Sequence, residues 1–283
     1  MNIVIAVPSA LMAAVCFGIG SVLQHEAARQ ASVQESMRLR LLLDLARRPR
    51  WLAGLGLSVS SFAFLGLALA YGPLALVLPL AATDLLFALP FLALRRAERL
   101  TRWEKTGMAC TAGGVAVFLA VLPLSAGVTL PALHDWVPAF AVIVGAVALL
   151  APMGARRPGW VRTAAYAVCA ALMLALLDGL AKSTAGRFRA DGLEVLLHWE
   201  PYALITVGVT SLVLSQSAFQ AGSLAVSLPI IDTLEPIGAV AIGIVVFGEQ
   251  LALTGGALTV QMLGAAAAVT GIILLARSPL ATV

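Results

Sequence analysis

Long apolar runs with almost no charge are the feature of this sequence that most restricts its fold. Residues 52–70, 74–94 and 204–217 approach or exceed the roughly 20 apolar residues that a helix needs to cross about 30 Å of hydrocarbon. Only 11% of the 283 residues are charged, against roughly 25% in soluble domains. A transmembrane β-barrel would show segments of about ten residues that alternate in polarity, whereas these runs are apolar on every face. The sequence therefore predicts an all-α polytopic membrane protein.

We expect about nine transmembrane helices, with ten as the alternative. The expected spans are residues 3–23, 51–71, 73–94, 104–123, 136–153, 161–182, 200–220, 224–247 and 256–276. The five tryptophans support these positions, because each lies at or beside the start of a span, where the indole ring prefers the headgroup layer. No basic residue precedes the first apolar run, so we expect a retained span and not a cleaved signal peptide.

Basic residues give the expected orientation. Arginines crowd the first and third loops, which should face the cytoplasm, so the N-terminus is expected outside and the C-terminus inside the cytoplasmic membrane. Arg187 and Arg189 fall on the expected outer side as exceptions. In the first loop, residues 34–48 can separate leucines from arginines on opposite faces of a helix lying on the cytoplasmic surface. The net charge of +4 is explained by the basic residues on the cytoplasmic side of the membrane. No nucleic acid partner is therefore expected.

The sequence also repeats itself. The segment GPLALVLPL at 72–80 aligns without a gap with GSLAVSLPI at 222–230. Several single positions recur as well: Gly18 matches Gly179, Glu98 precedes Gly107 and Gly114, and Glu249 precedes Gly264 and Gly271. Because five spans separate the starts of the two units, the copies must enter the membrane from opposite sides. We expect two inverted repeats around a central cavity, 1–153 with five spans and 154–283 with four.

These motifs resemble the drug/metabolite transporter superfamily, in its EamA-type and bacterial NIPA-like branches. The resemblance rests on GPLALVLPL with ERL at 98–100, and on GSLAVSLP, TLEP at 233–236 and FGEQL at 247–251. It implies paired helical repeats around a central cavity. It also implies secondary transport of metabolites, drugs or, for NIPA-like members, magnesium. EamA-type proteins usually have ten helices with both termini inside, so the nine expected here favour the NIPA-like plan.

Three carboxylates lie in the middle of expected spans. A charge at the bilayer centre costs about 2.5–3.5 kcal/mol on insertion scales, so each one needs a reason. Asp84 follows Pro79, and the pair Asp232 and Glu235 follows Pro229; both prolines are expected to interrupt their helices and turn carbonyls toward a cavity. We expect these acids to bind a cationic substrate, ligate Mg²⁺ through water or carry a proton. The alternative is a structural hydrogen-bond network between helices.

Two further pairs of polar residues lie inside expected spans. Asp178 and Lys182 are four residues apart, so either they neutralise each other or Lys182 reaches the membrane interface. Gln216 and Gln220 form a polar stripe that either lines the pathway or joins helices.

Polar residues at span ends have weaker claims to a function. His25 and Glu26 form either a solvated helix end or a gate and proton relay. For Glu98 and Glu249, a helix-terminus or gating role is expected before substrate contact.

Alternating-access transport is the expected function, with a small molecule or cation as substrate and the lipid bilayer as surroundings. No nucleotide-binding motif is found, so transport should be secondary-active and need no cofactor. The motifs HExxH and GxSxG and an Asp-rich metal motif are absent from the sequence, so no enzyme is expected. A non-transporting membrane scaffold is the remaining alternative.

Overall fold

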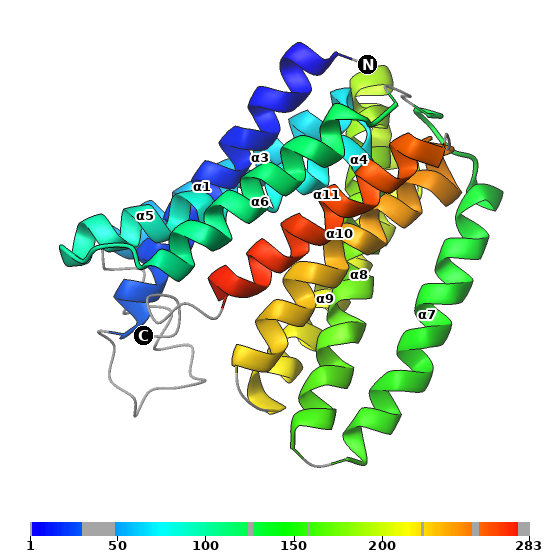
Figure 1. The fold of residues 1–283 in the computed structure, drawn as a ribbon. Helices are drawn as coiled ribbons and strands as arrows, with labels where there is room; N and C mark the ends of the chain where they lie inside the picture. The colour runs from blue at the N-terminus through cyan, green and yellow to red at the C-terminus, as the bar shows by residue number, and fades with distance from the viewer. Residues whose placement is uncertain are drawn as a thin grey trace.

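The computed structural model describes residues 2–29, 49–123, 127–157, 159–221, 224–250 and 255–276, and its regular elements there are helices (Figure 1). In chain order they are α1 Ile3–Arg29, α3 Pro49–Tyr71, α4 Leu74–Ala81, α5 Leu85–Arg96, α6 Arg102–Ala120, α7 Leu133–Ala155, α8 Trp160–Asp191, the 3₁₀ helix η2 Gly192–Leu197, α9 Glu200–Ala221, α10 Leu224–Phe247 and α11 Gly255–Ala276. The all-α prediction is confirmed for these residues. The segment expected as an amphipathic surface helix, 34–48, lies outside them.

Seven helical segments of the described chain are long and apolar enough to cross a membrane. They are 3–23, 49–71, 74–96, 133–155, 160–197, 230–247 and 255–275. Helix α9 contributes a shorter apolar stretch, Glu200–Ser215, and α6 carries three charged residues in its first turn. The protein is therefore a multi-pass membrane protein. Each of the nine expected spans overlaps a helix, but length and apolarity single out seven of them.

The third expected span is not one helix. It consists of α4 and α5, separated by a turn at residues 82–84. Pro79 lies inside α4, and the helix ends at Ala81, two residues later. Proline removes one helical hydrogen bond and crowds the carbonyl four residues earlier, so it weakens the turn of helix around it. The span is interrupted one turn after Pro79, while α4 continues through the proline itself.

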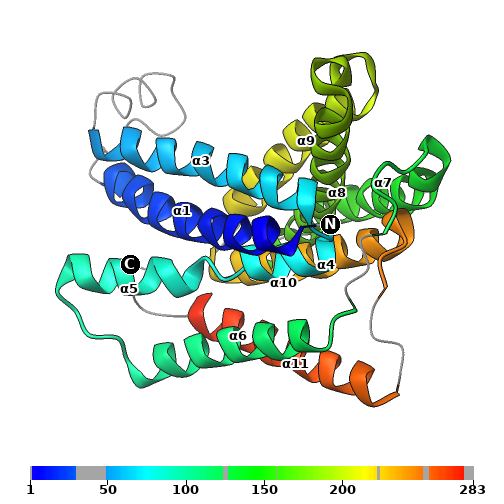
Figure 2. The same cartoon turned by 90° about the horizontal axis from the view of Figure 1, so that it is seen from above.

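The helices pack in antiparallel pairs. Helix α1 lies along α3, α8 along α9, and α6 along α11, while α10 packs against α8 and α4 (Figure 2). Helix α7 packs against α8 and α10 at the edge of the bundle. The resulting apolar core joins side chains from helices of both halves of the chain.

Repeated glycines form the contact between α6 and α11. A Cβ atom on Gly114 would lie 2.6 Å from the carbonyl oxygen of Gly264, and one on Gly107 would lie 3.3 Å from that of Gly271. Because glycines seven residues apart are two turns apart, each pair occupies one helix face. The glycine pairs of the two halves thus meet each other, and their lack of side chains permits the close antiparallel approach.

Helices α5 and α10 end in the same way. Each is followed by a residue in the left-handed conformation, Ala97 with φ 53° and Gly248 with φ 63°. The next residue then turns its N–H back onto the helix, with N–O distances of 2.9 Å from Glu98 to Ala93 and 2.9 Å from Glu249 to Gly243. The Glu98 bond reaches back five residues, as is usual for a helix that closes with a left-handed residue, and the Glu249 bond reaches back six.

One tryptophan differs from the expected interfacial position. Trp136 is fully buried, and its ring lies 5.7 Å from Phe247, 5.8 Å from Trp199 and 6.0 Å from Phe140, measured between centroids. Its position at a span start suggested the headgroup layer. The indole packs instead inside the protein, where aromatic contacts join α7 to the residue before α9 and to α10.

Candidate functional site

The turn between α4 and α5 places Asp84 inside the bundle. Asp84 directly precedes α5, at the N-cap position. Helix α1 packs closely against this turn, because a Cβ atom on Gly18 would lie 2.5 Å from the carbonyl oxygen of Asp84 and 3.2 Å from the amide nitrogen of Ala88. Gly18 therefore lets α1 pack directly against the helix break that carries Asp84, a half-buried acid.

Three further acids interact with Asp84 directly or through one another. Asp178 comes from α8, and Asp232 and Glu235 come from one face of α10. Asp84 and Glu235 each interact electrostatically with Asp232, and Glu235 also interacts with Asp178 and Asp84. We call Asp84, Asp178, Asp232 and Glu235 the acidic cluster. Three of its members were expected to lie together; Asp178 was expected to belong with Lys182.

The acidic cluster has little compensation within the protein. Asp178 is 7% exposed, and its Oδ2 atom has no hydrogen-bond partner. None of the ion pairs found in the described part of the chain involves a member of the cluster. Carboxylates that repel one another in a poorly solvated site need a cation or protons to be stable.

Lys182 forms its ion pair outside the acidic cluster. The sequence left two positions open for it, a pair with Asp178 or the membrane interface; no ion pair with Asp178 is found in the described chain, and the side chain is buried in protein. Lys182 is 4% exposed and forms an ion pair and hydrogen bond with Oε1 of Glu249. The reason is a stronger partner: Glu249 reaches α8 from the α10–α11 loop, and its carboxylate is held in place by other donors.

Those donors are the first free amides of α4. The N–H of Leu74 donates to Oε1 of Glu249 at 2.7 Å, and the N–H of Ala75 donates to Oε2 at 2.9 Å. A helix N-terminus presents unpaired N–H groups with a partial positive charge, so it stabilises a carboxylate. The helix-terminus role expected for Glu249 is confirmed, and the helix is one from the first half of the chain.

A cavity of about 150 Å³ adjoins the acidic cluster. Asp232 and Thr233 contribute its polar wall, and the rest is apolar. The rest of the lining comes from α4 and the turn after it, from α6, from α10 and from α11: Pro79, Ala82, Val115, Phe118, Pro236, Ile237, Val240, Met262, Ala265, Ala268, Val269 and Ile272. An apolar cavity of similar volume in another protein accommodates benzene. Sequence reasoning missed the α6 and α11 residues, because apolar side chains in a membrane helix look the same whether they face lipid or a cavity.

Other predicted site residues lie outside what the structure describes. The side chains of Gln216, Gln220, His25, Glu26 and Pro229 are among them. The backbone at position 229 is described, and α10 continues through it from Leu224 to Phe247. The interruption expected at Pro229 is therefore not found, since neighbouring groups in a membrane helix can accommodate a proline within it.

Within the described ranges, no group of three His, Cys, Asp or Glu side chains is arranged to hold a metal ion. The acidic cluster is thus a region of shared negative charge, and its geometry is not that of a preformed metal site.

Comparison with known proteins adds one relative. No family model and no solved structure matches this sequence. It is 28% identical over 258 residues to an uncharacterised protein of Corynebacterium glutamicum, an alignment that covers 87% of this chain and 86% of that protein. The similarity runs along most of both chains and carries no functional name.

Proposed function

We propose that this protein is a secondary-active transporter that moves a small organic solute across the cytoplasmic membrane by alternating access. The observation that supports it is the acidic cluster, drawn from three parts of the bundle and placed beside an apolar cavity. A group of acids inside membrane spans has a stability cost that function must justify. The solute we infer is amphipathic, with a cationic group for the acids and an apolar part for the cavity.

The transport cycle follows from the electrostatics. When the cationic group of the solute lies beside Asp232 and Glu235, it replaces the solvation that the carboxylates lack. When the solute leaves, protons take its place on the same carboxylates, because like charges at short range in a low dielectric do not all remain ionised. Competition between solute and protons for one set of acids would couple their movements in opposite directions.

The architecture we propose for this task has nine spans in two inverted repeats, residues 1–153 and 154–283. Helix α6 and helix α9 supply the two spans beyond the seven that apolarity alone identifies. Support comes from the paired glycines between α6 and α11 and from the matched left-handed ends of α5 and α10. The pairing of α1 with α3 and of α8 with α9 is also what two copies of one unit would produce. This arrangement agrees with the resemblance to the drug/metabolite transporter superfamily.

The proposed orientation is N-terminus outside and C-terminus inside. Two outer arginines seemed to weaken it, and both have specific contacts that give them another role. Arg187 binds Glu200 with an Nη2–Oε1 distance of 2.9 Å, and Arg189 lies over the ring of Tyr71 at 4.7 Å. Arginines fixed in tertiary contacts are poor indicators of membrane side, so the loop arginines carry more weight.

Flux measurements in proteoliposomes test the function. The panel contains tetraphenylphosphonium as a lipophilic cation, a neutral amino acid and Mg²⁺. We expect uptake of the lipophilic cation, driven by an opposing proton gradient. Asp84→Asn and Glu235→Gln should each reduce it roughly tenfold or more, since a charged contact contributes about 1.5–3 kcal/mol. Glu194→Gln is the matched control, because Glu194 is an exposed acid in η2, outside the cluster.

The other outcomes have distinct meanings. Flux of Mg²⁺ alone would replace the organic solute with a divalent cation. If both cluster variants transport as fast as the unmodified protein, the acids do not belong to the transport pathway. Folded protein that moves no member of the panel would favour the scaffold alternative.

A further inference from the structure

One end of the bundle is closed by polar contacts between the two halves of the chain. Glu249, in the loop after α10, holds the N-terminus of α4 through the amides of Leu74 and Ala75 and binds the ammonium group of Lys182 from α8. Glu249 is 3% exposed. We call Glu249, Lys182 and the first turn of α4 the latch.

Aromatic and backbone contacts support the latch. The Lys182 ammonium lies 4.3 Å from the centroid of the Phe247 ring, close enough for a cation–π interaction. The carbonyl of Phe247 accepts a hydrogen bond from the N–H of Val128 at 2.6 Å, so the α6–α7 connection is fastened to the same point. Gly243 leaves room for the carboxylate: a Cβ atom there would lie 2.5 Å from Oε2 of Glu249.

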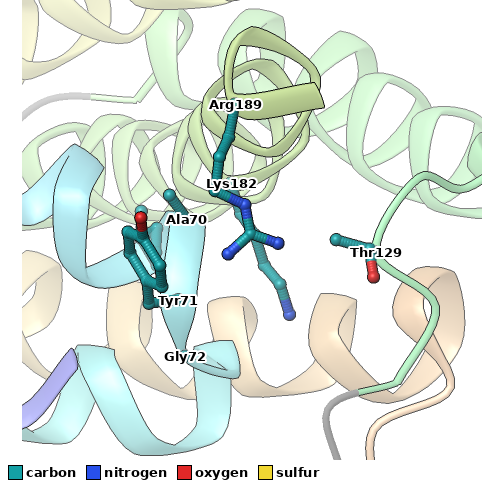
Figure 3. Close-up of a pocket in the computed structure, with 7 residues that line it drawn as sticks. Ala70, Tyr71, Gly72, Thr129, Lys182 and Arg189 are labelled. Carbon is teal, nitrogen blue, oxygen red and sulfur yellow. The ribbon is translucent and has the colours of Figure 1, made fainter. Parts of the chain in front are cut away.

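Beyond the latch there is space for water and not for a solute. The hollow there has a volume of about 30 Å³ and is lined by Leu69, Ala70, Tyr71, Gly72, Thr129, Lys182 and Arg189. Figure 3 shows Lys182 and Arg189 pointing from α8 into the space between Tyr71 and Thr129. That volume holds about one or two water molecules. This hollow is therefore too small to hold a solute.

The helices that meet at the latch each carry, or lead into, a member of the acidic cluster. Helix α4 leads into the turn with Asp84, α8 places Asp178 one turn before Lys182, and α10 carries Asp232 and Glu235 before it reaches the Glu249 loop. A movement that separates α4 from Glu249 would thus displace the acids relative to one another.

The carboxylate that matches Glu249 in the sequence repeat is in a different state. Glu98 also follows a left-handed residue at a helix end, yet it is exposed, whereas Glu249 is buried. The same element of the repeat is engaged at one end of the bundle and solvent-accessible at the other. The two matched carboxylates therefore differ in their surroundings, and the contact described here is made by Glu249.

We infer that the latch is the gate on the outer side of the membrane, and that the structure represents the outward-closed state. The inference rests on the proposed transport function. Charged contacts suit a gate, because water can replace each partner when the helices separate. The α6–α11 glycine contact has no such replacement and should persist through the cycle.

Labelling of a single cysteine tests the gate without measuring transport. Ala82→Cys places a thiol in the cavity beside the acidic cluster, in a protein whose native Cys16, Cys110 and Cys169 are replaced by serine. A membrane-impermeant maleimide is applied to the outside of intact cells. We expect slow labelling with the latch intact. Glu249→Gln should accelerate it roughly tenfold or more, because it weakens a charged contact that holds the gate shut.

Matched variants distinguish a gate from a contact that is needed only for folding. Glu98→Gln makes the same change at the repeat-related, exposed position and should leave the outside labelling rate unchanged. Lys182→Gln removes the other partner and should reproduce the acceleration. A parallel protein keeps only the native Cys169, which is fully buried and stays unlabelled while the bundle is folded.

The outcomes decide the inference. Unchanged labelling of Ala82→Cys in folded Glu249→Gln and Lys182→Gln proteins would overturn the gate while leaving transport intact. Equal acceleration by Glu98→Gln would also overturn it. If both latch variants expose Cys169, the contact is a requirement for folding and not a gate. If the latch variants label faster but the protein transports no solute, the latch is supported as a contact that opens, and the proposed transport function is contradicted.

Discussion

At the residue scale, the partner of Lys182 is the most informative detail. A lysine four residues after Asp178 on one helix is an ordinary i,i+4 pair, but the ammonium group binds Glu249, 67 residues away in sequence. Glu249 is satisfied by three donors, whereas Asp178 keeps an oxygen with no hydrogen-bond partner. In the described chain, the charges of the latch are therefore paired with each other, whereas no ion pair involves the acidic cluster.

This division predicts opposite effects on stability. Lys182→Met should lower the free energy of unfolding by about 3 kcal/mol, because it leaves the buried Glu249 carboxylate without its counter-charge. Asp178→Asn should leave stability unchanged or raise it, because it removes a buried charge with no ion-pair partner in the described chain. Thermal unfolding of the detergent-purified variants measures both. A loss of stability in Asp178→Asn equal to that of Lys182→Met would mean that the two residues pair with each other.

At the element scale, the α6–α11 contact depends on the absence of side chains. Gly114→Ala would place a Cβ atom 2.6 Å from the carbonyl oxygen of Gly264, a backbone atom that cannot move aside. We expect a loss of about 1–3 kcal/mol of stability, typical of overpacking. Gly113→Ala is the matched control, since its Cβ atom would meet nothing within 4 Å. That variant should be neutral or gain up to about 1 kcal/mol from helix propensity. Equal melting temperatures for the two variants would argue against the packed contact.

The end of α5 gives a second test at this scale. Ala97 adopts φ 53°, a left-handed conformation that costs an L-residue roughly 1–2 kcal/mol and costs glycine almost nothing. Ala97→Gly should therefore stabilise the protein by up to about 1 kcal/mol. Gly248→Ala, at φ 63° in the matching position before Glu249, should destabilise it by a similar amount. Melting temperatures that move in the same direction in both variants would contradict the shared geometry of the two helix ends.

At the scale of the whole molecule, local sequence patterns predicted the helices well and their contacts poorly. Each expected span overlaps a helix, because an apolar run long enough to cross a bilayer is a property of one continuous segment. The burial of Trp136 and the apolar lining of the cavity escaped prediction, because both depend on helices distant in sequence. For the site, Asp84, Asp232 and Glu235 stood out since charge inside a membrane span is rare. The partner of Lys182 did not, since a tertiary partner leaves no local pattern.

The orientation of the molecule in the membrane gives the last prediction. The start of α4, Val128 and Glu249 meet at one end of the bundle, as their positions on the expected outer side require. Leu193, which is 77% exposed in η2, belongs to the same side, whereas the exposed Arg99 lies in the basic loop between α5 and α6. In intact cells, an impermeant maleimide should therefore label Leu193→Cys and leave Arg99→Cys unlabelled until the membrane is permeabilised. The reverse pattern would invert the protein and place the latch on the cytoplasmic side. Labelling of both cysteines from outside would mean that one of the proposed spans between residues 99 and 193 does not cross the membrane, because an odd number of crossings is needed to separate them.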